Sequence, residues 1–267
     1  MSDKPHISPT QVEMYSRCGE QYRRRYKEQH IIPPGISLVR GSAVHIGAEL
    51  NYKQKVESHR DLPRKDIVDR SASAFDDKVR AEGILLNPDE ESRGKKVVLA
   101  EGKDSTVRLA GLYSDKVAPQ VQPKLVEATQ TLSIPGTSHD LLCRLDVLDD
   151  QGVIRDTKTG MKTKPQSDWD ASVQLTFYWA VALALKLNPT GIVIDQLIDT
   201  KEPKYVMSVT SRGDADVTAL LNRVNAFVAG VRAGIFIPAP TGSWWCSPNW
   251  CGYWKTCSYI NNERRGE

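Results

Sequence analysis

The sequence lacks an apolar run long enough to cross a bilayer. A membrane-spanning helix needs about 20 consecutive apolar residues, and the longest apolar run, FYWAVALAL at 177–185, is much shorter. We therefore expect no membrane segment and interpret this run as a buried helix. The first residues, MSDKPHISPT, lack a basic stretch followed by an apolar one, so we expect no secretory signal and a cytoplasmic protein.

The sequence also has few cysteines and a small net charge. The chain has 5 cysteines among 267 residues and a formal net charge of +3. Thiols stay reduced in the cytosol, which favours metal or cluster ligation over disulfides. The small net charge indicates no class of partner, but the basic run QYRRRYKEQH at 21–30 is a local exception. Its arginines, Arg23, Arg24 and Arg25, are either candidate contacts to DNA phosphates or a solvated face.

Helical patterns dominate the first 120 residues. Residues 7–26 predict a helix with Ser8 as cap and Gln11 completing a capping box. The positions spaced by three and four residues should share one inward face of it; they are Val12, Tyr15, Cys18, Tyr22 and Tyr26. Further helices are expected at 41–58, 64–83 and, more weakly marked, 105–120.

The pattern then changes to strands. Three consecutive segments predict a β-meander with turns at PGTSHD (135–140) and DDQG; they are 124–134, 141–149 and 153–160. A long apolar helix capped by Ser167 or Asp168 should follow at 167–189. Two more strands are expected at 191–199 and 204–210, and a last amphipathic helix at 213–234. The sequence has no internal repeat.

Two carboxylates and a lysine gather on the meander. Asp156 and Lys158 are two apart in a strand and so project to the same face. The preceding hairpin can bring Asp146 beside them. Carboxylates of this kind hold Mg²⁺ or Mn²⁺, which suits phosphodiester hydrolysis. The tripeptide DTK alone is common, and an ordinary solvated hairpin is the competing interpretation.

Five motifs in order make the chain resemble the RecB-like branch of the PD-(D/E)xK nucleases. They are SPTQVEMYSRC, GSAVH, CRLD, DTKTG and QLTFY, and they extend over most of the chain. The resemblance implies an α/β fold with a restriction-endonuclease-like core, in which helices flank a central mixed β-sheet. It also implies metal-dependent cleavage of DNA.

The resemblance assigns roles to particular residues. It implies that Mg²⁺ or Mn²⁺ is held by His45, Asp146, Asp156 and the backbone carbonyl of Thr157. Lys158 would serve the attacking water or the transition state, and Gln174 and Tyr178 would position the DNA backbone or the lysine. Glu127 is either an auxiliary ligand or a surface charge. Cys143 stands where relatives have a small residue, and we expect it to be a buried strand residue.

The remaining four cysteines resemble the set in the AddB-type and CRISPR-adaptation nucleases. One lies near the N-terminus and three lie in WWCSPNWCGYWKTC, residues 244–257; they are Cys18, Cys246, Cys251 and Cys257. In those relatives four thiolates hold a 4Fe–4S cluster that joins the two ends of the nuclease domain. Zinc is the alternative, although zinc sites usually have two tight cysteine pairs. We expect the aromatic residues around the thiols to shield the cluster or to fill the core; they are Trp244, Trp245, Trp250, Tyr253 and Trp254.

Together these observations predict a single nuclease domain over residues 1–267. Within it we expect a helical insertion at about 60–120 and a C-terminal cysteine cassette at 240–260. The predicted function is a metal-dependent exonuclease that processes double-stranded or single-stranded DNA ends for recombination, as in phages, with a single-strand annealing protein as candidate partner. A CRISPR-adaptation nuclease, a non-catalytic cluster-stabilised DNA-binding module and a zinc-stabilised structural protein are the alternatives. The helicase motif GxxxxGK[ST] is absent, which predicts a stand-alone nuclease.

Overall fold

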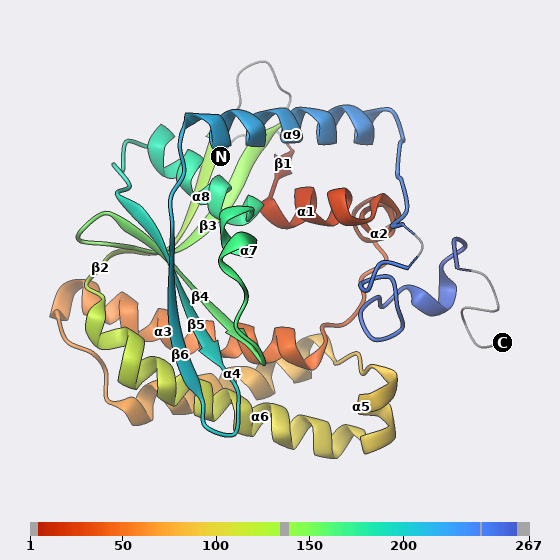
Figure 1. Cartoon of the computed structure of the whole chain (residues 1–267). Coiled ribbons are helices and arrows are strands. Elements are labelled where there is room, and N and C mark those ends of the chain that lie inside the picture. The colour runs from red at the N-terminus through yellow and green to blue at the C-terminus, as the bar shows by residue number, and fades with distance from the viewer. Residues whose placement is uncertain (1–4, 134–138, 241, 261–267) are drawn as a thin grey trace.

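A mixed β-sheet lies between two layers of helices (Figure 1). The structure is a computed structural model and describes residues 5–133, 139–240 and 242–260. Among these, six strands form the sheet: β1 (His6–Ile7), β2 (Pro123–Ser133), β3 (Asp140–Asp149), β4 (Val153–Gly160), β5 (Gly191–Ile198) and β6 (Lys204–Thr210). None of the helices in the described part combines the length and apolarity that a membrane span requires.

Strand β3 is the centre of the sheet topology. β2 pairs antiparallel with one edge of it, from Asp140 to Asp149. The other edge pairs with β1 only at its beginning, and with β4 only at Val147 and Leu148. β4 continues parallel to β5, and β5 antiparallel to β6. The parallel pair needs a crossover, which α7 (Gln166–Asp170) and α8 (Val173–Ala184) supply.

Helices cover both faces of the sheet, as the fold-class prediction required. In Figure 1 the lower layer contains α3 (Ile36–Ser58), α4 (Arg64–Glu82), the short α5 (Pro88–Arg93) and α6 (Lys95–Leu112). The upper layer contains α1 (Pro9–Arg17), α2 (Gly19–Tyr22), α8 and α9 (Asp214–Arg232). Leu109 and Tyr113 share a buried cluster with Val147 and Leu197 of the sheet. Region 60–120 therefore supplies part of the main core.

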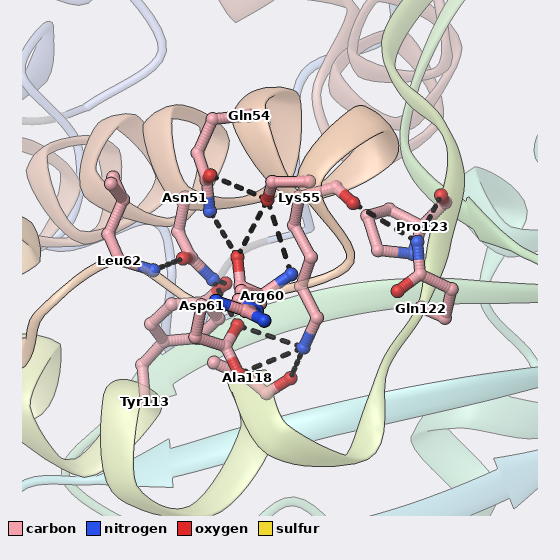
Figure 2. A network of polar contacts seen from close by, with 11 residues as sticks. Asn51, Gln54, Lys55, Arg60, Asp61, Leu62, Tyr113, Ala118, Gln122 and Pro123 are labelled. Atoms are coloured by element: carbon pink, nitrogen blue, oxygen red, sulfur yellow. Dashed lines mark hydrogen bonds and ion pairs between the residues drawn. The ribbon is translucent and has the colours of Figure 1, made fainter.

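A buried polar network fixes the end of α3 (Figure 2). The Lys55 ammonium, 5% exposed, donates to both carboxylate oxygens of Asp61 at 2.9 Å and to the Ala118 carbonyl at 2.8 Å. Asn51 accepts from the Leu62 backbone N–H at 2.7 Å. Since each donor of a buried charge needs a partner, this network sets the position of α3 relative to the loop that follows it and the segment that precedes β2.

Four predicted helix boundaries were wrong. The helix expected at 41–58 begins earlier, at Ile36. The first helix breaks at Cys18, which is extended (φ −161°, ψ 102°). The reason is Gly19, whose N–H donates to the Ile237 carbonyl at 2.7 Å and whose Cβ, if present, would lie 2.6 Å from Ile237 N. The predicted helix at 105–120 begins earlier, at Lys95.

The long helix expected at 167–189 is two helices, α7 and α8. Ser172 caps the second, its hydroxyl accepting from the Leu175 N–H at 3.3 Å, so neither Ser167 nor Asp168 caps it. The capping box of Ser8 and Gln11 and the strand pattern from Pro123 onward are confirmed. The predicted turn at 135–140 falls largely outside the described residues.

The contact between α3 and α4 generates a stability prediction. A Cβ on Gly47 would lie 2.0 Å from Ser71 Oγ and 2.8 Å from the Ile67 carbonyl oxygen, and the backbone atom cannot easily move. We expect Gly47→Ala to lower the free energy of unfolding by about 2 kcal/mol, measured by urea denaturation. The control is Gly191→Ala at the start of β5, whose Cβ meets nothing within 4 Å and which should change stability by less than about 0.5 kcal/mol. Equal stability of the two variants would contradict close packing at Gly47.

Candidate active site

The candidate site begins where β3 and β4 separate. Their last ladder pair is Val147 with Arg155. One residue further, the Asp146 carboxylate accepts from the Thr157 backbone N–H at 3.4 Å, so a side chain takes the place of a ladder hydrogen bond. The separation leaves Asp146 half-buried between the two strands, with 17% of its side chain exposed.

A chain of hydrogen bonds runs from β4 to α8. The Lys158 ammonium donates to Asp156 Oδ1 at 3.0 Å and to Gln174 Oε1 at 2.9 Å. Gln174 Nε2 donates in turn to the Tyr178 hydroxyl at 2.5 Å. The predicted same-face placement of Asp156 with Lys158, and of Gln174 with Tyr178, is confirmed. The chain holds the ammonium in one position because both its bonded oxygens are fixed.

A second group lies beside this chain, on the α3 side. His45 Nδ1 lies 3.3 Å from Asp146 Oδ2. One ligand atom from each of His45, Glu127 and Asp146 lies within 4.8 Å of the others, and no other such group of three is found in the described ranges. Gly41 lets α3 approach this closely, since a Cβ there would lie 3.0 Å from Thr159 Oγ1.

Glu127 has an uncommon backbone for a strand residue. Its φ is +48°, a region that few residues other than glycine occupy. It lies between Val126 and Ala128, whose partners Val147 and Leu145 flank Asp146, so the two acidic residues face each other across the strands. Conformations of this kind cost about 1–3 kcal/mol and concentrate at functional sites. The geometry favours the auxiliary-ligand interpretation of Glu127 over that of a surface charge.

Burial and neighbouring charges shift several pKa values. Desolvation, then the Asp146 carboxylate, raises the pKa of Glu127 to about 7. Desolvation raises the pKa of the fully buried Asp156 to about 6 against the opposing effect of Lys158. Burial opposes the charge of Lys158, but Asp156 and Asp146 outweigh it and raise the lysine pKa. The lysine therefore stays an ammonium, while the carboxylates are held in an environment that disfavours their negative charge.

Such a site fits a divalent cation. Carboxylate and imidazole groups are ordinary ligands of Mg²⁺ and Mn²⁺. Asp156 Oδ2 is buried and accepts no hydrogen bond, although the Lys158 ammonium lies 2.9 Å away. Thr157 lines the same cavity as His45, Glu127 and Asp146. A cation in this cavity would offset the crowding of negative charge on Glu127 and Asp146. Asp156 is not among the residues that line the cavity and does not belong to the group of three.

Three charged residues near the site were not predicted. Glu49, four residues after His45 on the same face of α3, lines the cavity, and this spacing could have indicated it. Arg144 forms ion pairs with Glu127 and, at 3.4 Å, with Glu49. Glu13 of α1 accepts from the Gln174 backbone N–H at 3.3 Å, at the start of α8. No pattern in the sequence indicates that last contact, because 161 residues separate its partners.

The four predicted cluster cysteines line a single cavity. It is formed by Cys18, Cys246, Cys251 and Cys257, together with Glu20, Arg24 and other residues. The Ala239 N–H donates to Cys18 Sγ at 3.3 Å. No three of these sulfur atoms lie within 4.8 Å of one another, since the only group of that kind in the described part of the chain is the one at His45. The cysteines thus converge from both ends of the chain, and the cluster itself stays a prediction.

The aromatic residues of the cassette do not all shield the thiols. Tyr253 and Trp254 are buried and line the cavity. Trp244 and Trp250 are instead exposed by 63% and 65%. The shielding interpretation therefore fits the first two and fails for the last two. Cys143, as expected, is buried in the sheet, and burial raises its pKa to about 12.

The three arginines of the basic run have different surroundings. Arg23 and Arg24 both pair with Glu20, which is 2% exposed, at 2.7 Å. Arg24 also donates to the side chain and carbonyl of Thr256 at 3.0 Å, which joins the π-helical turn Arg23–Lys27 to the cassette. Arg25 lies over the Tyr26 ring, 5.7 Å from its centroid. Contact with DNA phosphates remains a prediction for all three.

The comparisons with known proteins agree with this geometry. A model of the PD-(D/E)XK nuclease superfamily matches residues 6–258. Among solved structures, the chain is similar to a candidate exonuclease from Eubacterium rectale, with 11% identity, a TM-score of 0.61 and coverage of 97% of this chain and 90% of the other. SSO0001 is a weaker match, with 12% identity, a TM-score of 0.43 and coverage of 97% and 88%. No curated protein sequence matches the chain.

The raised pKa of Glu127 predicts a pH dependence of stability in the metal-free protein. Its pKa of about 7 exceeds the ordinary 4.5, so the folded state binds a proton more tightly than the unfolded state. The resulting stabilisation is complete below pH 4.5 and is lost as the pH rises through about 7. In EDTA, wild type should lose about 2–3 kcal/mol more unfolding free energy than Glu127→Gln over this range. Parallel pH profiles for the two proteins would contradict the burial of this carboxylate.

Proposed function

Because the chain belongs to the PD-(D/E)XK nuclease superfamily, we propose that it is a divalent-metal-dependent deoxyribonuclease that acts on DNA ends. The observation that carries the proposal is the bonded chain from Asp156 through Lys158 and Gln174 to Tyr178, beside the group of His45, Glu127 and Asp146. A purely structural or DNA-binding module has no need for a lysine held against a fully buried carboxylate, since burying that charge is costly to fold.

In this proposal His45, Asp146, Asp156 and the Thr157 carbonyl hold the cation, and Glu127 joins them. When bound, Mg²⁺ or Mn²⁺ polarises the scissile phosphate and lowers the pKa of a water molecule. Lys158 presents its ammonium to the attacking water or to the charge that develops on the phosphate oxygens. Gln174 and Tyr178 keep that ammonium in position, since Gln174 accepts from it and donates to Tyr178.

Action on ends has separate support. The structure of the candidate exonuclease from Eubacterium rectale has the same fold over 97% of this chain. At 11% identity this likeness concerns the fold alone, so the assignment as an exonuclease rests on analogy with that protein. Digestion of DNA labelled at its 5′ or 3′ end, compared with closed circular DNA, tests it. Cleavage of the circle at the same rate would exclude an obligate exonuclease.

The nuclease proposal predicts the effect of removing the lysine. With Mn²⁺ or Mg²⁺, wild type should cut labelled linear duplex DNA, and Lys158→Ala should cut it at least about 100-fold more slowly. The matched control is Lys116→Ala, which removes an exposed ammonium beyond the end of α6 and should leave the rate unchanged. Equal background cutting by wild type and Lys158→Ala would exclude the enzyme and leave the DNA-binding module as the better interpretation.

For the cysteine cavity we propose a 4Fe–4S cluster. Four cysteine ligands suit zinc or an iron–sulfur cluster. A tetrahedral zinc site with Zn–S bonds of about 2.3 Å requires sulfurs about 3.8 Å apart, whereas no three of these sulfurs come within 4.8 Å of one another. The larger cluster suits the wider spacing. Burial and the other three thiols raise the pKa of Cys251, so a positively charged group is needed to stabilise the four thiolates together.

The cluster predicts colour and added stability. Anaerobically purified wild type should be brown, with absorbance at about 400 nm, and Cys251→Ser should lose this absorbance. Cys143→Ala is the matched control, since Cys143 lies in the sheet core away from the cavity. Joining Cys18 to residues more than two hundred positions later should stabilise the fold by about 4–5 kcal/mol. A colourless wild type with one bound zinc would contradict the cluster and leave the nuclease proposal untouched.

A further inference from the structure

Two tryptophans of the cysteine cassette face solvent without a partner surface. Trp244 is 63% exposed and Trp250 is 65% exposed, the largest exposed fractions of any aromatic side chain among the described residues. Each lies within two positions of a cysteine that lines the cavity, Cys246 or Cys251. Such large apolar rings in water are unfavourable and mark a contact surface when they occur together.

The two rings form one preorganised unit. Trp244 packs edge-to-face against Trp250, with centroids 5.2 Å apart and an interplanar angle of 85°. It contacts Trp245 in the same way at 5.6 Å. Ser247 connects the backbone, because its hydroxyl donates to the Trp244 carbonyl and its own carbonyl accepts from the Trp250 N–H. Edge-to-face packing leaves a flat ring face open for a further aromatic system.

The surroundings of the pair favour a polyanion. Residues 235–260 contain neither Asp nor Glu and include Lys255. The charge of Arg25 acts on the Tyr253 hydroxyl, and Arg24, whose charge is balanced by Glu20, lies over the Tyr253 ring. A purely apolar partner would not need this bias, and an acidic one would not need the exposed rings, whereas a nucleic-acid strand combines negative phosphates with flat bases.

Helix α1 connects the candidate active site to the cavity of the cysteine cassette. Helix α1 contacts the start of α8 through Glu13, and Cys18 at its end lines the cysteine cavity. Five helical residues between these points span about 8 Å. The contact with α8 and the cysteine cavity thus lie at the two ends of one short segment of α1.

We propose that Trp244 and Trp250 form a stacking site for the unpaired bases of the DNA strand that is being processed. The inference rests on the proposed nuclease function and extends it to single-stranded segments. An aromatic ring stacks on any base, so the site binds without sequence preference. It would hold the separated strand at the cassette while the groups of the candidate site act on its backbone.

The test separates base contacts from phosphate contacts. Affinity is measured by fluorescence anisotropy in the Lys158→Ala background, so that DNA is not cut. The two probes are a labelled oligothymidylate and an abasic oligonucleotide of equal length and charge. We expect Trp250→Leu to weaken binding of the oligothymidylate about tenfold and to leave binding of the abasic probe unchanged. Trp250→Phe keeps a ring and should retain most of the affinity, and Trp244→Leu should behave like Trp250→Leu.

Met207→Ala is the matched control, because Met207 is a large apolar side chain of β6 with 52% exposure. It should bind both probes like the parent protein. If the tryptophan variants bind the oligothymidylate as tightly as the parent does, the stacking site is overturned and a protein partner becomes the better occupant. An equal loss for both probes would overturn it too, since bases would then play no part. The cutting assay uses protein with intact Lys158 and does not depend on these binding measurements. Failure of the nuclease proposal is therefore distinguished from failure of the stacking site.

Discussion

The pairing of β3 with its neighbours is the constraint on which the candidate site depends. β2 occupies one edge of β3 along its whole length. On the other edge, β1 pairs only with the first two residues of β3 and β4 only with Val147 and Leu148. The part of that edge around Asp146 consequently has no strand partner. A carboxylate there replaces the missing ladder bond by accepting from Thr157 N–H. A continuous β3–β4 ladder would close this space, and with it the room for a cation and a phosphate.

Around this opening the fold keeps charges that would otherwise be expelled. Asp156 is completely buried and Lys158 shares its hydrogen bonds with Asp156 and Gln174. Removing one member of a buried ion pair is strongly destabilising because the other charge remains without compensation. Glu127 lacks such a lysine and is balanced by Arg144 from the surface. The two carboxylates are therefore balanced differently. Asp156 is paired with an ammonium that two hydrogen bonds hold in place, and Glu127 is paired with an exposed guanidinium.

The parts of the fold that could be predicted are those set by neighbouring residues in sequence. Alternation placed Asp156 and Lys158 on one face, and helical spacing did the same for Gln174 and Tyr178. The errors came from tertiary contacts. Cys18 ends a helix because Gly19 packs on Ile237, 218 positions later in the chain. Ser172 rather than Ser167 caps α8 because the helix breaks where the buried Arg212 guanidinium donates to the carbonyls of Trp169 and Ser172. Glu127 joins His45 and Asp146 through strand register, which no single segment encodes.

Helix α1 connects the candidate active site to the cysteine cavity, and protein contacts alone fix both of its ends. Its start has the Ser8 capping box, and its other end is held where Gly19 meets Ile237 and where Ala239 N–H donates to Cys18. The Tyr15 hydroxyl adds a bond to the Ile235 carbonyl at 2.7 Å. Arg24 joins the same region to Thr256. A group bound by the four cysteines would therefore strengthen a junction that protein contacts already form. Since Glu13 of the same helix accepts from the Gln174 backbone N–H, the rigidity of that junction also bears on how firmly Gln174 holds Lys158.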